Sequence, residues 1–394
     1  MRIHRRGWIA ALVLALAAGL VISVLHLNRD AATSSPELDL AAVLGDLDSA
    51  GYARAEQVRA FQFPRDHGAH PAYRTEWWYF TGNLYTPAHR RFGYELALFR
   101  IALRPESPKH PSQWATNQVY MAHFAVTDVG GKKFHFFERF VRGAVGLAGA
   151  EANPFRVWAE NWSVQADSEH ANRWRLRAVS DGEGDQLELA LDLIPVKPIV
   201  LQGDRGLSRK SATPGNASYY YSLPRIATRG TLTIGEKKFA VTGESWMDRE
   251  WSTSALSPDQ AGWDWFALQL ANGYELMFYR MRRKDGSVDP YSMGTLIDPK
   301  GRTTPLRSGD VTIEALDTWQ SRHGGIYPAR WRMTVKPLRL SLDIKPVLAD
   351  QELDVSVRYW EGAVDISGSL GGNTIAGHGY VELTGYGAEK RLHR

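Results

Sequence analysis

The hydrophobic pattern of the chain changes near residue 61. From Phe61 onward, apolar and polar residues alternate in short segments that end at Gly, Pro, Asn or Asp. Clear examples are WRLRAVS (174–180), LELALDL (187–193) and WRMTVKP (331–337). Strict alternation between turn residues is typical of half-buried antiparallel strands. Helical periodicity is almost missing after residue 61, so the sequence predicts an all-β body.

The N-terminus has a different pattern. Arg2, Arg5 and Arg6 precede an uncharged run of 18 residues, Trp8–Leu25. Basic residues before such a run predict a cytoplasmic N-terminus and an exported body. The length lies between that of a signal-peptide core and that of a spanning helix, so residues 1–29 are a signal peptide or a signal anchor. Since no clean cleavage site follows, the anchor is favoured.

This interpretation places the body on the periplasmic side, either free or tethered to the inner membrane through that helix. Residues 30–60 look like a tether with a short helix, and residues 388–394 look like a tail. The chain has no Cys, which excludes lipoprotein attachment, disulfides and thiol chemistry.

The body repeats itself. WWYFTGNL (77–84) followed by GYELALFR (93–100) returns as WDWFALQL (263–270) followed by GYELMFYR (273–280). Three more pairs follow in the same order: YMAHFAVTDVGGKK with YSMGTLIDPKGR, LELALDLIPV with LRLSLDIKPV, and GESWMD with GHGYVE. Four ordered matches predict two copies of one β domain, at residues 61–248 and 249–387.

Two antiparallel domains of this size are expected to close into barrels that hide their edge strands. A barrel of about eight strands can hold one apolar ligand. The chain is also rich in aromatic residues, with 14 Trp, 16 Tyr and 14 Phe. The sequence therefore predicts two tandem antiparallel β-barrels, some of whose rings line a ligand cavity.

Several function classes are excluded or disfavoured. The net charge is only +4 and the basic residues are scattered, which argues against a nucleic-acid partner. The chain has no P-loop, no H-E-x-x-H motif and no complete nucleophile elbow. Asp66, His67 and His70 match no strong ligand spacing, so we expect no metal and no cofactor.

Acidic residues stand beside aromatic ones in several places. Glu76 precedes Trp77 and Trp78, and Asp264 lies between Trp263 and Trp265. In the segment WMDREW (246–251), alternation puts Trp246, Asp248 and Glu250 on one face and Met247, Arg249 and Trp251 on the other. An acid enclosed by rings loses solvation and its pKa rises, and ring faces stabilise a developing cation.

The alternative interpretation is structural. The motif GYEL and its trailing Arg occur twice, which favours a repeated ion pair, Glu95 with Arg100 and Glu275 with Arg280. Repetition in both copies indicates a role in the architecture. On that reasoning, Glu76 and Trp78, which are peculiar to the first copy, are the favoured places for function.

Four long segments resemble one family: DHGAHPAYRTEWWYFTGNL, GESWMDREWSTSAL, GWDWFALQLANGYELMFYR and YWEGAVDISGSLGGNTIAGHGYVELTGY. They are similar to the AttH / hydroxyneurosporene synthase family, which includes carotenoid 1,2-hydratase and kievitone hydratase. The resemblance covers about residues 55–388. It implies two tandem lipocalin-like barrels and, for the hydratases, cofactor-free addition of water to an isoprenoid double bond. There a carboxylic acid protonates the alkene and water captures the tertiary cation.

That mechanism needs a protonated acid in an apolar pocket and a wall of aromatic side chains, and this chain has candidates for both. The candidate acids are Asp248, Glu250 and Glu76. The candidate ligand-binding residues are Trp77, Trp78, His123, Trp246, Trp251, Trp263, Trp265 and Tyr279.

Three functions stay open. The first is a hydratase acting at the domain junction on an apolar isoprenoid or lipid. The second is a carrier or chaperone for such a molecule, serving an ABC transporter permease. The third is a scaffold with filled barrels. Carboxylates without an Arg partner that face one cavity favour the enzyme, and carboxylates paired with Arg favour the others.

Overall fold

The computed structural model describes residues 38–39, 50–106, 111–170, 172–180, 186–254 and 256–387. The predicted N-terminal signal or anchor, most of the tether and the predicted tail lie outside these residues. No helix in the described ranges is long and apolar enough to cross a membrane. The residues beyond Leu38 belong to one unit, Asp39–Arg394.

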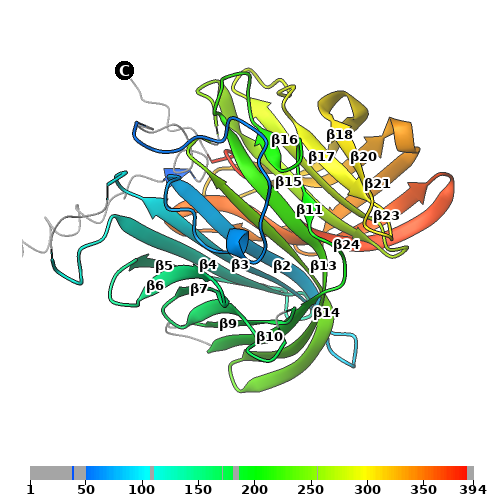
Figure 1. Cartoon of the computed structure of the whole chain (residues 1–394). Coiled ribbons are helices and arrows are strands. Elements are labelled where there is room, and N and C mark those ends of the chain that lie inside the picture. Colours follow the sequence, from blue (N-terminus) through cyan, green and yellow to red (C-terminus); the bar gives the residue numbers. More distant parts are fainter. Residues whose placement is uncertain are drawn as a thin grey trace, which may run out of the picture. The chain divides into compact units, whose positions relative to one another are not determined.

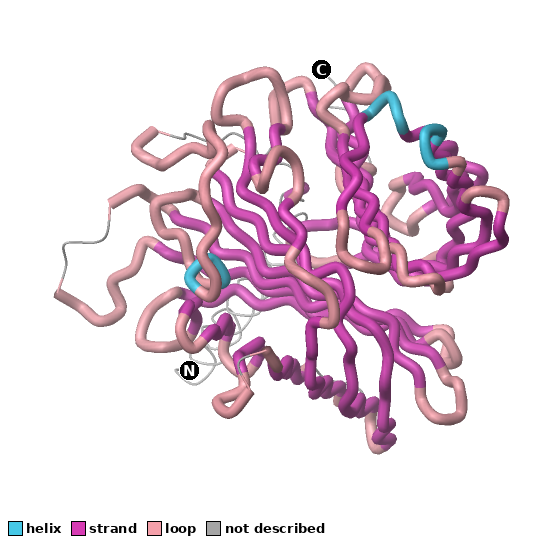
Figure 2. The backbone as a smooth tube through the Cα atoms, turned by 45° about the vertical axis from the view of Figure 1, so that its right-hand side comes forward, coloured by secondary structure: helices cyan, strands magenta, loops and turns pink. Residues whose placement is uncertain are grey.

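The body is all-β, as predicted, and Figure 2 shows helix only in short turns. The first sheet consists of β2 (Thr75–Tyr85), β3 (Arg91–Ala102), β4 (Gln118–Asp128), β5 (Lys133–Arg142), β6 (Ala148–Ala152), β7 (Phe155–Ala159), β8 (Trp162–Ala166), β9 (Trp174–Val179), β10 (Leu187–Pro195), β11 (Val200–Leu201), β12 (Leu207–Arg209), β13 (Ala217–Ile234) and β14 (Lys237–Ser252). Its strand order is β5-β4-β3-β2-β14-β13-β10-β9-β8-β7-β6, and β11 and β12 pair with β13.

The second sheet follows it in the chain. Its strands are β15 (Gln260–Leu270), β16 (Glu275–Arg283), β17 (Met293–Ile297), β18 (Thr303–Arg307), β19 (Val311–Gln320), β20 (Ile326–Val335), β21 (Leu340–Pro346), β22 (Glu352–Leu353), β23 (Val357–Leu370) and β24 (Asn373–Leu383). The order is β18-β17-β16-β15-β24-β23-β21-β20-β19, with β22 beside β23. The remaining elements are β1 (Leu38–Asp39) and three 3₁₀ turns, η1 (Arg65–His67), η2 (Ser308–Asp310) and η3 (Lys336–Leu338).

The two sheets have the same strand order over nine positions. β2, β3, β4 and β5 correspond to β15, β16, β17 and β18, and β14, β13 and β10 correspond to β24, β23 and β21. The four pairs of repeated segments lie on equivalent strands, so the internal repeat predicted from sequence is confirmed in the topology. The predicted division after residue 248 falls inside β14, which runs on to Ser252.

The architecture is a nearly closed, barrel-like sheet and a second sheet that meets it. Figure 1 shows the second sheet, from β15 onward, against the blue-to-green strands of the first. Each sheet encloses its own apolar core, and a third cluster of buried residues packs between the sheets. β2 contacts β24, β3 contacts β23 and β13 contacts β15. Because side chains alternate along a strand, one face of each central strand packs in the core of its own sheet and the other face packs in the junction between the sheets.

Candidate functional site between the two sheets

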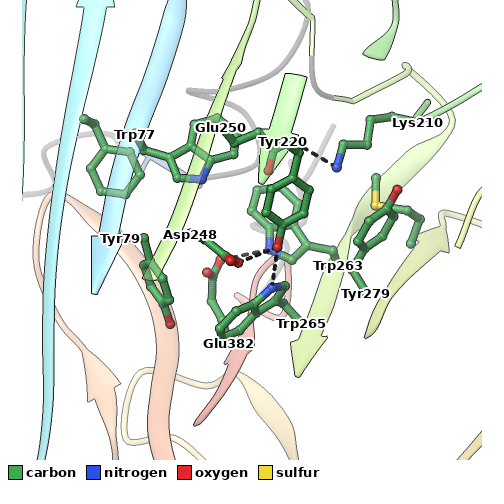
Figure 3. Close-up of a pocket in the computed structure, with 12 residues that line it drawn as sticks. Trp77, Tyr79, Lys210, Tyr220, Asp248, Glu250, Trp263, Trp265, Tyr279 and Glu382 are labelled. Atoms are coloured by element: carbon green, nitrogen blue, oxygen red, sulfur yellow. Dashed lines mark hydrogen bonds and ion pairs between the residues drawn. The ribbon is translucent and has the colours of Figure 1, made fainter. Parts of the chain in front are cut away.

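A pocket opens at the junction of the two sheets. Aromatic rings and three carboxylates line it (Figure 3). The lining residues are Trp77, Tyr79, Phe99, Lys210, Tyr220, Asp248, Glu250, Trp263, Trp265, Tyr279, Met281 and Glu382. Both sheets contribute, and Lys210 follows β12.

The pocket has an approximate two-fold symmetry that comes from the repeat. Equivalent positions of the two copies face it in pairs: Trp77 with Trp263, Tyr79 with Trp265, Phe99 with Tyr279, and Asp248 with Glu382. Such pairing is expected where two similar halves meet through the same face of each, because the same patch then occurs on both sides. The repeated residues thus form the walls of the cavity and also contribute to the fold.

Asp248 is almost fully buried and accepts hydrogen bonds from three donors. Ser222 Oγ and Trp246 Nε1 donate to its Oδ1 at 2.5 and 2.7 Å, and Tyr220 donates to Oδ2. Burial raises the pKa of Asp248 to about 7, although these hydrogen bonds oppose the change. No Arg or Lys pairs with Asp248 among the described residues, so this carboxyl can hold or release a proton near neutral pH.

Tyr220 can serve both protonation states of Asp248. Trp265 Nε1 donates to its hydroxyl oxygen at 3.1 Å, while the hydroxyl itself donates to Asp248. Burial and the neighbouring Asp248 raise the pKa of Tyr220 well above its usual value, so the phenol stays neutral. Because a hydroxyl hydrogen rotates freely, Tyr220 can donate to the carboxylate or accept from the carboxylic acid.

Glu382 is the second proton-holding carboxyl of the pocket. Trp263 Nε1 donates to its Oε1 at 2.9 Å. Burial, followed by the nearby Glu95, raises the pKa of Glu382 to about 8. The charge of Asp248 adds to this rise, so the two equivalent acids interact electrostatically across the pocket. Near neutral pH their environment favours at least one proton on the pair.

Glu250 has a different environment. It shares the pocket-facing side of β14 with Asp248, and Ser218 donates to its Oε1. Lys210 Nζ lies 3.0 Å from the same oxygen and 4.1 Å from the ring centre of Tyr279. Burial lowers the pKa of Lys210, but Glu250 and Tyr279 outweigh it and the net change is upward. Glu250 is therefore paired with a cation, whereas Asp248 is not.

The predicted aromatic residues are divided between the pocket and the core. Trp77, Trp263, Trp265 and Tyr279 line the cavity, and Trp246 lies in the junction cluster, bonded to Asp248. Trp78 and Trp251 instead lie in the core of the first sheet. The alternation expected for residues 246–251 is what the structure has, with Met247 and Trp251 on the core side.

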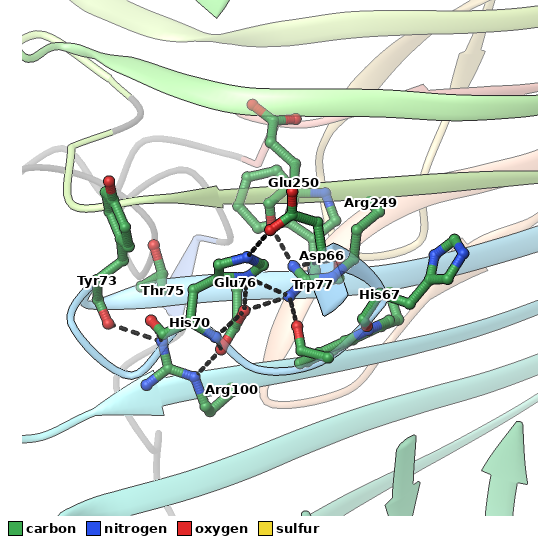
Figure 4. Close-up of polar contacts among 12 residues, drawn as sticks. Asp66, His67, His70, Tyr73, Thr75, Glu76, Trp77, Arg100, Arg249 and Glu250 are labelled. Atoms are coloured by element: carbon green, nitrogen blue, oxygen red, sulfur yellow. Dashed lines mark hydrogen bonds and ion pairs between the residues drawn. The ribbon is translucent and has the colours of Figure 1, made fainter. Parts of the chain in front are cut away.

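Glu76 lies outside the pocket, in a charged cluster shown in Figure 4. Its two oxygens bind Arg100 and Arg249, and the His70 amide donates to both at 3.0 Å. Burial would raise the pKa of Glu76, but Arg100 and Arg249 outweigh it and hold the pKa far below the usual range. Glu76 therefore stays ionised, and the structure gives it no means of donating a proton near neutral pH.

Arg249 connects Glu76 to the core. Its guanidinium lies 3.9 Å from the ring centre of Trp78, and its Nη2 donates to the Gly68 carbonyl at 2.6 Å. His70, which accompanies this cluster, stacks on Trp251 at 3.8 Å between ring centres. The part peculiar to the first copy thus holds η1 against the first sheet.

The repeated ion pair predicted within each GYEL motif is wrong. Arg100 binds Glu76 and Arg280 binds Asp264, while Glu275 binds Lys197 and Arg225. Glu95 accepts from the Tyr359 hydroxyl at 2.8 Å. The reason is parity, because residues five apart on a strand point to opposite faces.

Several pocket residues are not among the site candidates of the sequence analysis: Tyr79, Phe99, Lys210, Tyr220, Met281 and Glu382. The repeat contained a signal for half of them, since Tyr79, Phe99 and Glu382 are the counterparts of Trp265, Tyr279 and Asp248. Lys210 and Tyr220 carry no such signal. His123 was expected at the ligand but lies behind the pocket, bonded to Tyr359 at 2.7 Å.

A metal centre finds no support in the described residues, where no group of three or more His, Asp or Glu side chains is placed to hold an ion. The pocket instead combines rings, hydroxyls and carboxyls. These groups can bind an apolar molecule, transfer a proton and stabilise a cation.

Comparison with known proteins agrees with this architecture. A family model described as AttH-like matches residues 54–386. A protein of Nitrosomonas europaea, provisionally designated AttH, is 34% identical over 85% of this chain and 99% of its own, with a TM-score of 0.74. Kievitone hydratase from Nectria haematococca is 16% identical over 85% of this chain and 98% of its own, with a TM-score of 0.62. CghA is 14% identical, with 85% and 96% covered and a TM-score of 0.51. The last two likenesses concern the fold alone, and no curated protein sequence matches the chain.

Proposed function

Because the chain belongs to the AttH-like family, we propose that it binds an apolar isoprenoid or lipid-like molecule in the junction pocket and adds water to a C=C bond of that molecule. The observation that carries the proposal is Asp248, a buried carboxyl without a cationic partner among the described residues, facing an aromatic cavity. A hydratase is also among the proteins that share the fold. We further propose that the two sheets are two tandem lipocalin-like barrels.

Proton transfer to carbon is the first chemical step. Asp248 in its acid form gives its proton to the less substituted alkene carbon, and Tyr220 turns its hydroxyl to donate to the resulting carboxylate. A pKa near 7 suits this role, because the acid form is populated at neutral pH and is still strong enough to give up its proton. Glu382, with a pKa of about 8, is a second carboxylic acid on the opposite wall that can supply a proton.

The rings stabilise the tertiary cation that protonation creates. Trp77, Trp263 and Tyr279 present aromatic groups to the cavity, and a cation near a ring face is attracted by its quadrupole. The same apolar wall restricts access of water. The cation is then captured by one positioned water molecule before it loses a proton to give a rearranged alkene.

Glu250 is placed to receive the proton that the attacking water releases. It lies two residues from Asp248 on the same face of β14, about 7 Å along the strand. This separation lets the acid and the base reach neighbouring carbons of one double bond. Lys210 Nζ pairs with Glu250 Oε1 at 3.0 Å and holds this side chain in place. Protons balance, because one goes to carbon from Asp248 and one returns from water to Glu250.

The protein acts at the inner membrane. Residues 8–25 anchor the chain in the inner membrane, and the body lies on the periplasmic side, where an apolar substrate can reach it from the bilayer. The reaction needs no cofactor, since acid, base and cation wall are all side chains.

Product analysis tests the proposal. The full-length protein is incubated with an acyclic carotenoid such as lycopene, and hydroxylated products are separated by chromatography. We expect a tertiary alcohol from the wild type and a loss of about 100-fold or more in Asp248→Asn. Asp128→Asn is the matched control, because Asp128 is buried and paired with Arg90 outside the pocket. Unchanged turnover in Asp248→Asn would remove Asp248 as the acid.

A second function is favoured by the hydrogen bonds of Asp248, because three donors satisfy it as they would a purely structural carboxylate. In that case the protein binds and carries an apolar molecule without changing it, in association with an ABC-type export system. Native mass spectrometry of the protein purified with its co-purifying lipids distinguishes the two. A carrier retains an unmodified lipid in both wild type and Asp248→Asn and forms no alcohol.

A further inference from the structure

A chain of buried polar side chains lies behind the pocket and reaches the surface. Glu138 on β5 is half-buried and accepts from exposed Ser356 at 2.6 Å. His123, fully buried on β4, has Nε2 3.2 Å from Glu138 and Nδ1 2.7 Å from the Tyr359 hydroxyl. Tyr359 donates to Glu95 at 2.8 Å. An unbroken series of hydrogen bonds therefore links the surface to a carboxyl in the interior.

The inner end of this chain touches the pocket. Tyr79, which lines the cavity, donates to Glu361 Oε1 at 2.5 Å. Glu361 lies opposite Glu382, the pocket acid, in the pairing of β23 with β24. Glu95 Oε2 and Glu361 Oε2 are both buried, and neither has a hydrogen-bond partner within the described ranges. Burial, followed by the charge of Glu95, raises the pKa of Glu361 well above its usual value, and each of the two carboxyls keeps one unused oxygen.

The equivalent position of the other copy shows that the fold does not require this arrangement. Glu275 is the counterpart of Glu95 and binds Lys197 and Arg225 at 2.6 Å each. It is therefore satisfied as an ordinary buried ion pair. Glu95 has no cation in the described structure and receives only the Tyr359 hydroxyl. A buried carboxyl without a cation costs stability, which points to a role beyond packing.

We propose that six side chains form a proton relay between the protein surface and the pocket: Glu138, His123, Tyr359, Glu95, Glu361 and Tyr79. The inference rests on the proposed function, because an acid that gives a proton to carbon must regain one before the next turnover. The proton released to Glu250 returns to solvent on the other side of the cavity. The relay resupplies Glu382, which lies opposite Glu361 in the pairing of β23 with β24 and shares the pocket with Asp248.

The transfer conserves protons at each link. A proton that solvent delivers to Glu138 passes to His123 Nε2, the Nδ1 proton passes to the Tyr359 oxygen, and the Tyr359 hydroxyl proton passes to Glu95. An imidazole suits this link because its two nitrogens can accept and donate in turn. Glu95 then shares the proton with Glu361, which is bonded to Tyr79 at the cavity wall.

Hydrogen–deuterium exchange of the buried carboxylic acids tests the relay without any ligand. The full-length protein in mild detergent is mixed with D₂O, and the C=O stretching bands of protonated carboxyls are followed by time-resolved infrared spectroscopy. Glu95→Gln and Glu361→Gln assign the bands. In Tyr359→Phe we expect exchange to slow by about 100-fold, because exchange must then wait for local opening. The bands remain visible, since removing a donor to Glu95 favours its neutral form.

Tyr94→Phe is the matched control. Tyr94 precedes Glu95 in β3, but its side chain points to the opposite face, where its hydroxyl donates to Ser245 beside the core of the first sheet. Its variant should exchange like the wild type, and both variants should keep similar melting temperatures. Equal exchange rates in Tyr359→Phe and wild type would overturn the relay. The exchange assay uses no substrate, so its result does not depend on whether the protein hydrates a carotenoid. A failure of the relay and a failure of the proposed hydration can therefore be told apart.

Discussion

Replacing Asp248 by Asn should change how the stability of the protein depends on pH. Burial raises the pKa of Asp248 from 3.8 to about 7, a difference of about 3 pH units. Each unit corresponds to about 1.4 kcal/mol, so ionising Asp248 in the folded protein costs about 4 kcal/mol. The folded state holds this proton more tightly than the unfolded chain. The stabilisation is therefore complete below pH 3.8, declines as pH rises toward 7 and is absent above it.

Asn cannot ionise, so the variant lacks this decline. The unfolding free energy of Asp248→Asn, relative to that of the wild type, should therefore rise by about 4 kcal/mol from about pH 4 to pH 8. Altered hydrogen bonds in the variant lower its stability by an amount that does not depend on pH, so they do not affect this rise. The assay is urea unfolding at a series of pH values, and the quantity compared is the difference in unfolding free energy between the two proteins. Asp128→Asn should show no such gain. A difference that stays constant from pH 4 to pH 8 would refute the assignment of a raised pKa to Asp248.

Three further changes test the charged and aromatic parts of the structure. Glu76→Gln leaves two buried arginines without their carboxylate and should lower the free energy of unfolding in urea by about 3–5 kcal/mol. Glu188→Gln breaks an exposed pair and should lower it by less than about 1 kcal/mol. A similarly small loss in both variants would contradict the stabilising role of the buried pair. Trp77→Leu removes a ring from the cavity wall and should weaken binding of an acyclic carotenoid about tenfold by fluorescence titration, with little change in melting temperature. Lys210→Met removes the cation beside Glu250 and should lower hydration about 100-fold in the product assay, an effect that a merely structural lysine would not produce at unchanged stability.

Much of the fold could be predicted because strand alternation and the internal repeat are local or near-local signals. The repeated segments, such as LELALDLIPV and LRLSLDIKPV, lie on equivalent strands, β10 and β21. The error on Glu95 and Arg100 came from reading a recurring motif as a contact. Alternation alone would have corrected it, since an odd spacing separates two side chains across the sheet.

The site was harder to predict, because two surfaces had to be brought together. Repetition was interpreted as architecture, and the residues peculiar to one copy were favoured for function. The structure has the reverse arrangement at Glu76 and Trp78, which are held in the first-sheet core. When two copies meet through equivalent faces, repeated residues converge on one cavity. Nothing in the sequence indicated that the copies meet in this way, or that Lys210 would reach Glu250 from 40 residues away.

The small differences between the two copies then explain where chemistry can occur. Equivalent acids, Asp248 and Glu382, face the pocket from both sides, but only the first copy follows its acid with a second carboxylate, since Thr384 stands at the position of Glu250. Glu95 is likewise unpaired with any cation in the described residues, whereas its counterpart Glu275 is neutralised. Each of these departures places a costly carboxyl in the junction without benefit to packing. The two copies thus give the pocket similar walls but different acids. This difference separates a proton donor, Asp248, from a proton acceptor, Glu250, and the addition of water to one double bond requires both.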